Sequence, residues 1–164
     1  WLCGSRIPKL YGSVGTSLHY KDLDFSLMCT YSIGGKIYDT IYKDLMEPTY
    51  VGQTYHLDSK RAWTEAGQVT DVPRVNTGTS SVANDRFLVD ASYFSIKNAS
   101  IGYTFKSNAL QKAYLQAIRV YAAADNIWLF SAMRGLNPQS SFNGSTSFTY
   151  TPTRTVSVGV DFKF

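Results

Sequence analysis

Residues 10–33 read LYGSVGTSLHY-KD-LDFSLMCTYSI, two runs of eleven residues on either side of Lys21-Asp22. Apolar residues favour the even positions of the first run and the odd positions of the second. This period of two predicts two β-strands joined by a tight turn. Antiparallel partners would then sum to 43, which places Cys29 opposite Val14 and away from Cys3. We therefore expect two free thiols.

The same alternation recurs downstream, around residues 99–105, 118–124 and 156–164. The predicted strands cover about 8–20, 23–35, 86–105, 117–130 and 153–164. Two long polar connections separate them, at about 36–85 and 131–152, whereas 21–22 and 106–116 are short links. The parity of Phe94 and Ile96 is opposite to that of Ala99 and Ile101. Either a bulge near Lys97 restores one apolar face, or Phe94 stands beyond that face.

Strand length and aromatic placement indicate what the apolar rows face. The rows hold no Asp, Glu, Lys or Arg, although 17% of the chain is charged. Runs of about eleven residues match the ~9–11 of a tilted transmembrane strand and exceed the ~5–6 of globular sheets. Aromatic residues gather at both ends of the strands, as they do at the two interfaces of a membrane barrel. At one end they are Tyr20, Tyr103, Phe105, Phe162 and Phe164, and at the other Tyr31, Tyr38, Phe87, Trp128 and Phe130.

These features predict an all-β protein, an antiparallel transmembrane β-barrel. About five strands are too few, since bacterial single-chain barrels have ~8 or more. We therefore expect the chain to supply the last strands of a larger barrel, with the others preceding Trp1. Membrane barrels have short periplasmic turns and long extracellular loops. On that rule 36–85 and 131–152 are extracellular loops, and the last strand ends in the periplasm.

Composition excludes other classes. The 16 basic and 12 acidic residues give a net charge of +4, and the longest basic run is Lys60-Arg61. No nucleic-acid partner is expected without a clustered basic face. No stretch approaches the ~18 apolar residues of a membrane-spanning helix. The opening Trp1-Leu2-Cys3-Gly4 has neither an initiator Met nor a signal peptide, which predicts that the chain is a piece of a longer protein.

Five segments resemble the SusC/RagA family of TonB-dependent outer-membrane transporters of Bacteroidetes. They are 7–12 (IPKLYG), 63–64 (WT) with 71–74 (DVPR), 92–105 (SYFSIKNASIGYTF), 119–127 (RVYAAADNI) and 152–164. The sequence departs from the family pattern at Ser13, where a second Gly is usual, and at Ser95, where Arg is usual. Residues 137–139 (NPQ) replace the family's DPE.

The resemblance implies a 22-stranded barrel with an N-terminal plug domain, which is absent from this chain. It further implies import of glycans or peptides across the outer membrane of a Gram-negative, Bacteroidetes-like bacterium. The implied partners are a SusD-like surface lipoprotein that acts as a lid, TonB through the missing N-terminal part, the lipid bilayer and the barrel-assembly machinery. The C-terminal row of Phe164, Phe162 and Val160 resembles the signal that this machinery recognises.

Two further groups of residues are candidate contact sites. Four aromatic residues could stack on a sugar or touch the lid, although loop packing or the interfacial girdle also accounts for them. They are Tyr50, Tyr55, Trp63 and Trp128. Four charged residues point inward by the alternation, where they could meet the lumen or the plug. They are Asp24, Arg119, Asp125 and Asp161.

No enzyme, metal or cofactor is expected, because neither His19 nor His56 has a partner at catalytic or ligating spacing. Two other functions remain open. A soluble carbohydrate-binding β-sandwich would also be rich in Tyr, Trp and small polar residues, and would bury its apolar rows. A porin independent of TonB would need neither a plug nor a lid.

Deleting Phe164 is expected to lower the amount of barrel assembled in the outer membrane, because it removes the end of the assembly signal. The measurement is heat-modifiable migration of the full-length protein extracted from outer membranes. An unchanged amount of folded protein would contradict this role.

Overall fold

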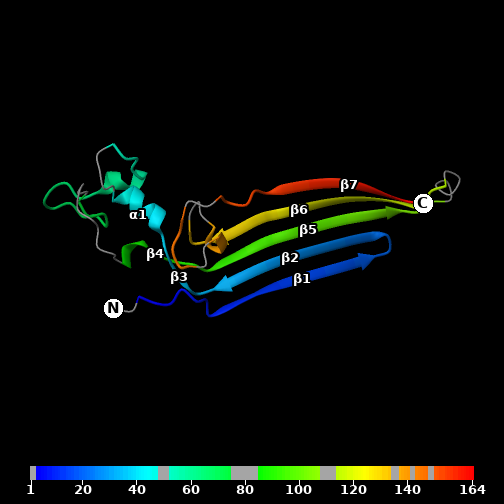
Figure 1. Ribbon diagram of the computed structural model, residues 1–164, viewed down its shortest axis with the longest axis horizontal. Helices are drawn as coiled ribbons and strands as arrows, with labels where there is room; N and C mark the ends of the chain where they lie inside the picture. Colours follow the sequence, from blue (N-terminus) through cyan, green and yellow to red (C-terminus); the bar gives the residue numbers. More distant parts are fainter. Residues whose placement is uncertain are drawn as a thin grey trace.

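The computed structural model describes residues 3–47, 52–74, 85–107, 114–133, 137–140, 143–147 and 150–164. Its main feature is an elongated sheet of five antiparallel strands in the order β1-β2-β5-β6-β7 (Figure 1). The strands are β1 (Leu10–Tyr20), β2 (Leu23–Ile33), β5 (Tyr93–Phe105), β6 (Ala117–Ser131) and β7 (Thr155–Lys163). Each strand therefore pairs with its predecessor in this sheet, and β1 and β7 form its two edges.

The first hairpin has the predicted register. Val14 faces Cys29, and Tyr20 faces Leu23 across the turn. Lys21 adopts a positive φ of 55° there, which lets two residues reverse the chain. Cys3 is exposed, Cys29 is buried and neither forms a disulfide, as the register predicted.

A stepped bulge crosses three strands. Leu27 faces Ala99 and Cys29 faces Ile96, so β5 holds one residue more than β2 over this interval. Ala99 faces Ala124 and Ile96 faces Trp128, so β6 holds one more again. Asn126 provides the second extra residue and has a φ of 50°, a conformation that Asn tolerates better than most residues. The predicted bulge is confirmed, and it places Ile96 on the same face as Ala99.

Beyond one end of the long sheet the chain forms a small subdomain (Figure 1). It contains β3 (Lys36–Tyr38), α1 (Thr40–Met46), the 3-10 turns η1 (Leu57–Arg61) and η2 (Asp85–Phe87), and β4 (Leu88–Asp90). β3 and β4 pair in a sheet of their own. Within the described residues, no helix has the length and apolar character needed to cross a membrane.

The sequence predicted one strand over 86–105, whereas the structure divides this segment at Ala91-Ser92. The Ser92 backbone N–H donates to the Asp90 carboxylate at 2.8 Å, and the Ser92 hydroxyl accepts from Gly34 N–H at 2.8 Å. Ala91 N–H donates to the Gly35 carbonyl at 3.1 Å. These bonds redirect the chain, so β4 and β5 belong to different sheets.

Residues 143–147, from the second long connection, join the same subdomain. Tyr38 N–H donates to the Gly144 carbonyl at 2.8 Å, and Thr146 N–H donates to the Tyr38 carbonyl at 2.9 Å. The Thr146 hydroxyl donates to Asp39 Oδ1 at 3.2 Å, and the same oxygen accepts from Tyr42 N–H at the start of α1. Arg6 donates to the Asn143 carbonyl at 3.2 Å. The two long connections and the residues before β1 therefore form one hydrogen-bonded body.

The apolar core lies in this subdomain. Its buried cluster is Met46, Ala62, Val72 and Phe87, with Tyr38 and Tyr42 packed against it. Phe87 is 1% exposed, and its ring makes edge contacts with Tyr38 at 6.2 Å and Tyr42 at 5.9 Å. In the long sheet only Cys29 and Ala117, among the hydrophobic residues described, are buried.

Phe87→Ala is expected to destabilise the subdomain by about 3–5 kcal/mol, because it removes the most buried large side chain. Amide exchange in the full-length protein should then accelerate at least ~100-fold at Glu47 N–H, which closes α1. Leu57→Ala is the control, since Leu57 is 71% exposed. Equal protection in the two variants would contradict the assigned core.

Candidate functional site

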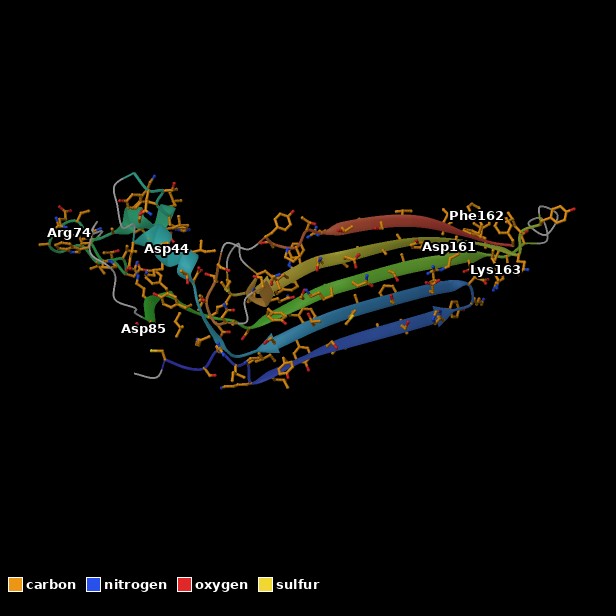
Figure 2. The ribbon with its side chains drawn as sticks, in the orientation of Figure 1. Asp44, Arg74, Asp85, Asp161, Phe162 and Lys163 are labelled. Atoms are coloured by element: carbon orange, nitrogen blue, oxygen red, sulfur yellow. The ribbon has the colours of Figure 1, made fainter. Side chains whose placement is uncertain are left out.

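One face of the long sheet is apolar, and none of the residues that the structure describes covers it. Val158 is 74% exposed, Val156 69% and Leu18 59%. The strand pairings place the following exposed side chains on this outward face: Leu10, Val14, Leu18, Tyr20, Leu23, Ile33, Phe94, Ile101, Tyr103, Phe105, Val120, Trp128, Phe130, Val156, Val158, Val160 and Phe162. In Figure 2, Phe162 projects from one side of β7 while Asp161 and Lys163 project from the other. The alternation of the sequence therefore becomes two chemically different surfaces.

Exposure of the outward face to water is unfavourable in free energy. Burying a Val, Leu or Phe side chain stabilises by about 1.5–3 kcal/mol, and apolar patches on soluble monomers seldom exceed a few hundred Å². Within the described ranges the second sheet, β3 with β4, lies at the end of the long sheet and not across it (Figure 1). The outward face thus has the exposure expected of a surface that meets hydrocarbon, and not that of a sandwich interior.

The opposite face, called the inward face below, is mostly polar, although the exposed Tyr11 and Met28 also lie on it. The hydroxyls of Ser26 and Ser100 are 2.8 Å apart. Asn98 donates to the Asp125 carboxylate at 2.7 Å. This face is suited to contact with water or with another polar protein surface.

A charged cluster occupies the inward face near the C-terminal end of the sheet. Arg119 Nη2 is 2.6 Å from Asp24 Oδ2, and its Nε is 3.1 Å from Asp24 Oδ1. Its Nη1 is 3.3 Å from Asp161 Oδ2. Arg119 and Asp24 lie on β6 and β2, so the fork reaches across β5. Gly102 makes this possible, because a Cβ there would lie 2.8 Å from both Arg119 Nη2 and Asp24 Oδ1.

Tyr121 extends the cluster toward β7. It pairs with Gly159, and its ring covers that residue so closely that any Cβ at Gly159 would overlap it. The Arg119 guanidinium carbon is 5.0 Å from the centroid of the same ring. Gly102 on β5 therefore leaves room for the side chain of Arg119, and Gly159 on β7 leaves room for the ring of Tyr121.

The structure brings together three of the four predicted inward charges. Asp24, Arg119 and Asp161 form the cluster, whereas Asp125 bonds to Asn98 further along the sheet. Sequence reasoning missed Gly102 and Tyr121 as members of this arrangement. The pairing of Gly102 with both Asp24 and Tyr121 was the available signal, and finding it required the register of β5.

The four candidate aromatic residues do not form one site. Tyr55 is 40% exposed in the subdomain, and Trp63 N–H donates to the Val72 carbonyl at 2.9 Å. Trp128 lies on the outward face, 6.0 Å from Phe130 and 5.5 Å from the Arg154 guanidinium. Tyr50 lies outside the described residues. A shared ligand platform of these four residues therefore has no geometric support in the described part of the chain.

The titratable side chains of the subdomain form hydrogen bonds within it. Burial raises the pKa of the Tyr42 phenol above its ordinary value, and its hydrogen bond to Asp58, 2.9 Å long, acts in the same direction. Two hydrogen bonds from Ser92 lower the pKa of Asp90; the bond from its side chain has the larger effect and the bond from its backbone the smaller. His56 Nδ1 accepts from Asp58 N–H at 3.2 Å. The ranges that the structure describes contain no group of three His, Cys, Asp or Glu side chains that could hold a metal.

The chain is similar in sequence to curated TonB-dependent receptors. It is 28% identical to TonB-dependent receptor P3 of Formosa agariphila over 99% of the chain, and 25% identical to TonB-dependent receptor SusC of Bacteroides thetaiotaomicron over 91%. It spans 17% and 14% of those two proteins. No family model matches the chain. The resemblance expected from the five segments is confirmed by these relatives.

Solved structures of the RagAB peptide importer share the fold. In the "closed-closed" state the match has a TM-score of 0.85 at 22% identity, over 99% of this chain and 18% of that one. In the "open-open" state the TM-score is 0.81. The predicted fold class is therefore confirmed: this is an antiparallel sheet similar to part of the RagAB barrel.

The pair formed by Asp24 and Arg119 is expected to couple in a double-mutant cycle. Asp24→Asn and Arg119→Gln together should destabilise the full-length protein by less than the sum of the single changes. Introducing Gly102→Ala should reduce this coupling, because the new Cβ displaces the guanidinium. Asp125→Asn with Arg119→Gln is the control and should be additive. Additivity of the first pair would refute the ion pair.

Proposed function

We propose that this chain is a wall segment of a TonB-dependent importer in the outer membrane of a Gram-negative bacterium. The observation that carries the proposal is the long, uncovered apolar face of the five-stranded sheet. The similarity to TonB-dependent receptors gives the class of transporter, and the likeness to the RagAB barrel supports the same placement.

The length of the strands fits this membrane placement. β1 and β2 have eleven residues each. Ten steps of ~3.3 Å tilted by ~40° rise roughly 25 Å, the height of the apolar band of a bacterial barrel. The outward rows therefore suffice to cover the hydrocarbon thickness without a charged side chain.

The inward face then lines the lumen, where a plug domain from another part of the protein would lie. The Asp24, Arg119 and Asp161 cluster is a polar contact for that plug, because a large barrel of this kind is plugged and not open. Asp125, bonded to Asn98, would contact the lumen higher on the wall. Energy from TonB would reach the channel through such a plug.

We assign the subdomain to the outside of the cell, since the tight turn between β1 and β2 lies at the opposite end of the sheet (Figure 1). The two long connections are joined there through Thr146 and Asp39. Such a joined surface suits a SusD-like lipoprotein lid, with Tyr55 and Trp63 available for contact. The substrate class is an oligosaccharide or a peptide, and RagAB is described as a peptide importer.

At the other end, Val160 and Phe162 are exposed on the outward face of β7, and the exposed Phe164 follows the last residue of that strand. We assign them the assembly signal read by the barrel-assembly machinery. A porin independent of TonB is the weaker alternative, because the sequence relatives are TonB-dependent receptors.

Spin labels introduced by Val158→Cys and Leu27→Cys in the reconstituted full-length protein test the membrane placement. Both labels should be accessible to oxygen and shielded from a water-soluble nickel chelate, because they face lipid. Ser157→Cys is the control on the inward face and should show the reverse preference. Immobile labels at 158 and 27, shielded from both reagents, would indicate a buried core and overturn the proposal.

A further inference from the structure

Two cations stack on aromatic rings of the outward face. Lys21 Nζ is 5.4 Å from the centroid of the Tyr20 ring. The Arg154 guanidinium carbon is 5.5 Å from the centroid of Trp128. Tyr20 is 70% exposed and Trp128 52% exposed. Each ring therefore holds a cation beside the apolar surface while its own outer side stays open.

The two pairs lie toward opposite ends of the sheet. Tyr20 is the last residue of β1 and adjoins the short turn. Trp128 lies beyond the stepped bulge, opposite Ile96, on the side of the sheet that leads to the subdomain. Arg154 immediately precedes β7 on that same side. The apolar side chains of the outward face occupy most of the interval between the two cations.

Neither cation has an acidic partner among the residues that the structure describes. Two other basic side chains near the sheet do have one: Lys106 is 2.7 Å from Asp22, and Arg119 is 2.6 Å from Asp24. The outward rows contain no carboxylate that could compensate Lys21 or Arg154. An aromatic ring can hold a cation in place, and a long basic side chain keeps its charged end at the border of an apolar surface. In a membrane, the anions at that border are the phosphates of the lipid headgroups, which attract such a cation.

We propose that Arg154 and Lys21 bind the phosphates of anionic lipid headgroups, one at each surface of the bilayer. This inference rests on the membrane placement proposed above and adds the chemistry of its two borders. The rings of Trp128 and Tyr20 hold the cations at headgroup level, so the contacts fix the depth of this wall in the membrane. A phosphate contact at each border also opposes vertical displacement of the strands.

The test uses the full-length protein with a bimane fluorophore attached through Pro152→Cys, two residues from Arg154. The protein is reconstituted in vesicles of phosphatidylcholine and phosphatidylglycerol at a 3:1 ratio. A headgroup nitroxide is carried either by phosphatidylglycerol or by phosphatidylcholine at the same mole fraction. Quenching by the anionic lipid should exceed quenching by the zwitterionic lipid by up to about fivefold, the enrichment expected for one interfacial cation.

Arg154→Gln should bring the quenching ratio close to one, whereas Arg154→Lys should keep it above one because the charge remains. Trp128→Leu should lower the ratio while retaining the charge, since the guanidinium loses its support. Lys60→Gln is the matched control, because Lys60 is an exposed cation of the subdomain, and should leave the ratio unchanged. A bimane attached through Leu18→Cys provides the same comparison for Lys21→Gln.

The outcomes separate this inference from the proposed function. Equal quenching by the two lipids in the unsubstituted protein would overturn the headgroup contacts and leave the membrane placement intact. Absence of quenching by either lipid would overturn both. Heat-modifiable migration of each variant verifies that the barrel is folded, so a loss of the ratio in a folded variant reports the contact itself.

Discussion

The long sheet depends on one constraint, which is that its three interior strands are hydrogen-bonded to a neighbour on both sides while its side chains build no core. Four ladders satisfy the interior strands, and the apolar rows then need an apolar medium in place of a second layer of protein. The only buried cluster in the described residues lies in the small subdomain. The two parts of the chain therefore differ in what stabilises them: the subdomain has its own packing, and the sheet, on the membrane placement proposed above, has hydrocarbon.

The stepped bulge preserves this division between faces. From β2 to β5 and from β5 to β6 the interval between equivalent outward residues grows by one residue each time. Without the extra residue in β5, Phe94 and Ile96 would turn to the inward face, since a shift of one residue reverses every side chain. The positive φ of Asn126 marks where β6 accommodates its own extra residue. Phe94, Trp128 and Phe130 thus share the outward face with the other apolar side chains because of two irregular positions.

Period two in the sequence was enough to predict five long strands, the turn at Lys21-Asp22, the pairing of Val14 with Cys29 and the bulge. The strands and the turn are set by neighbouring residues. The pairing and the bulge follow from which alternate positions are apolar. The break at Ala91-Ser92 was not predicted, because it depends on Ser92 bonding to Gly34, 58 residues away. The ion pair across Gly102 also needed the register of three strands. Likewise, the core around Phe87 combines short segments whose sequences carry no clear periodicity.

The bond between Thr146 and Asp39 joins residues 107 positions apart. Contacts of such high sequence separation form late, because the intervening chain must be ordered before they can close. Two long strands, β5 and β6, lie between the two residues, together with β4 and the short link that joins β5 to β6. Completion of the subdomain would therefore report that the pair formed by β5 and β6 is already in place. During folding, the subdomain could not be complete while this part of the long sheet was still unpaired.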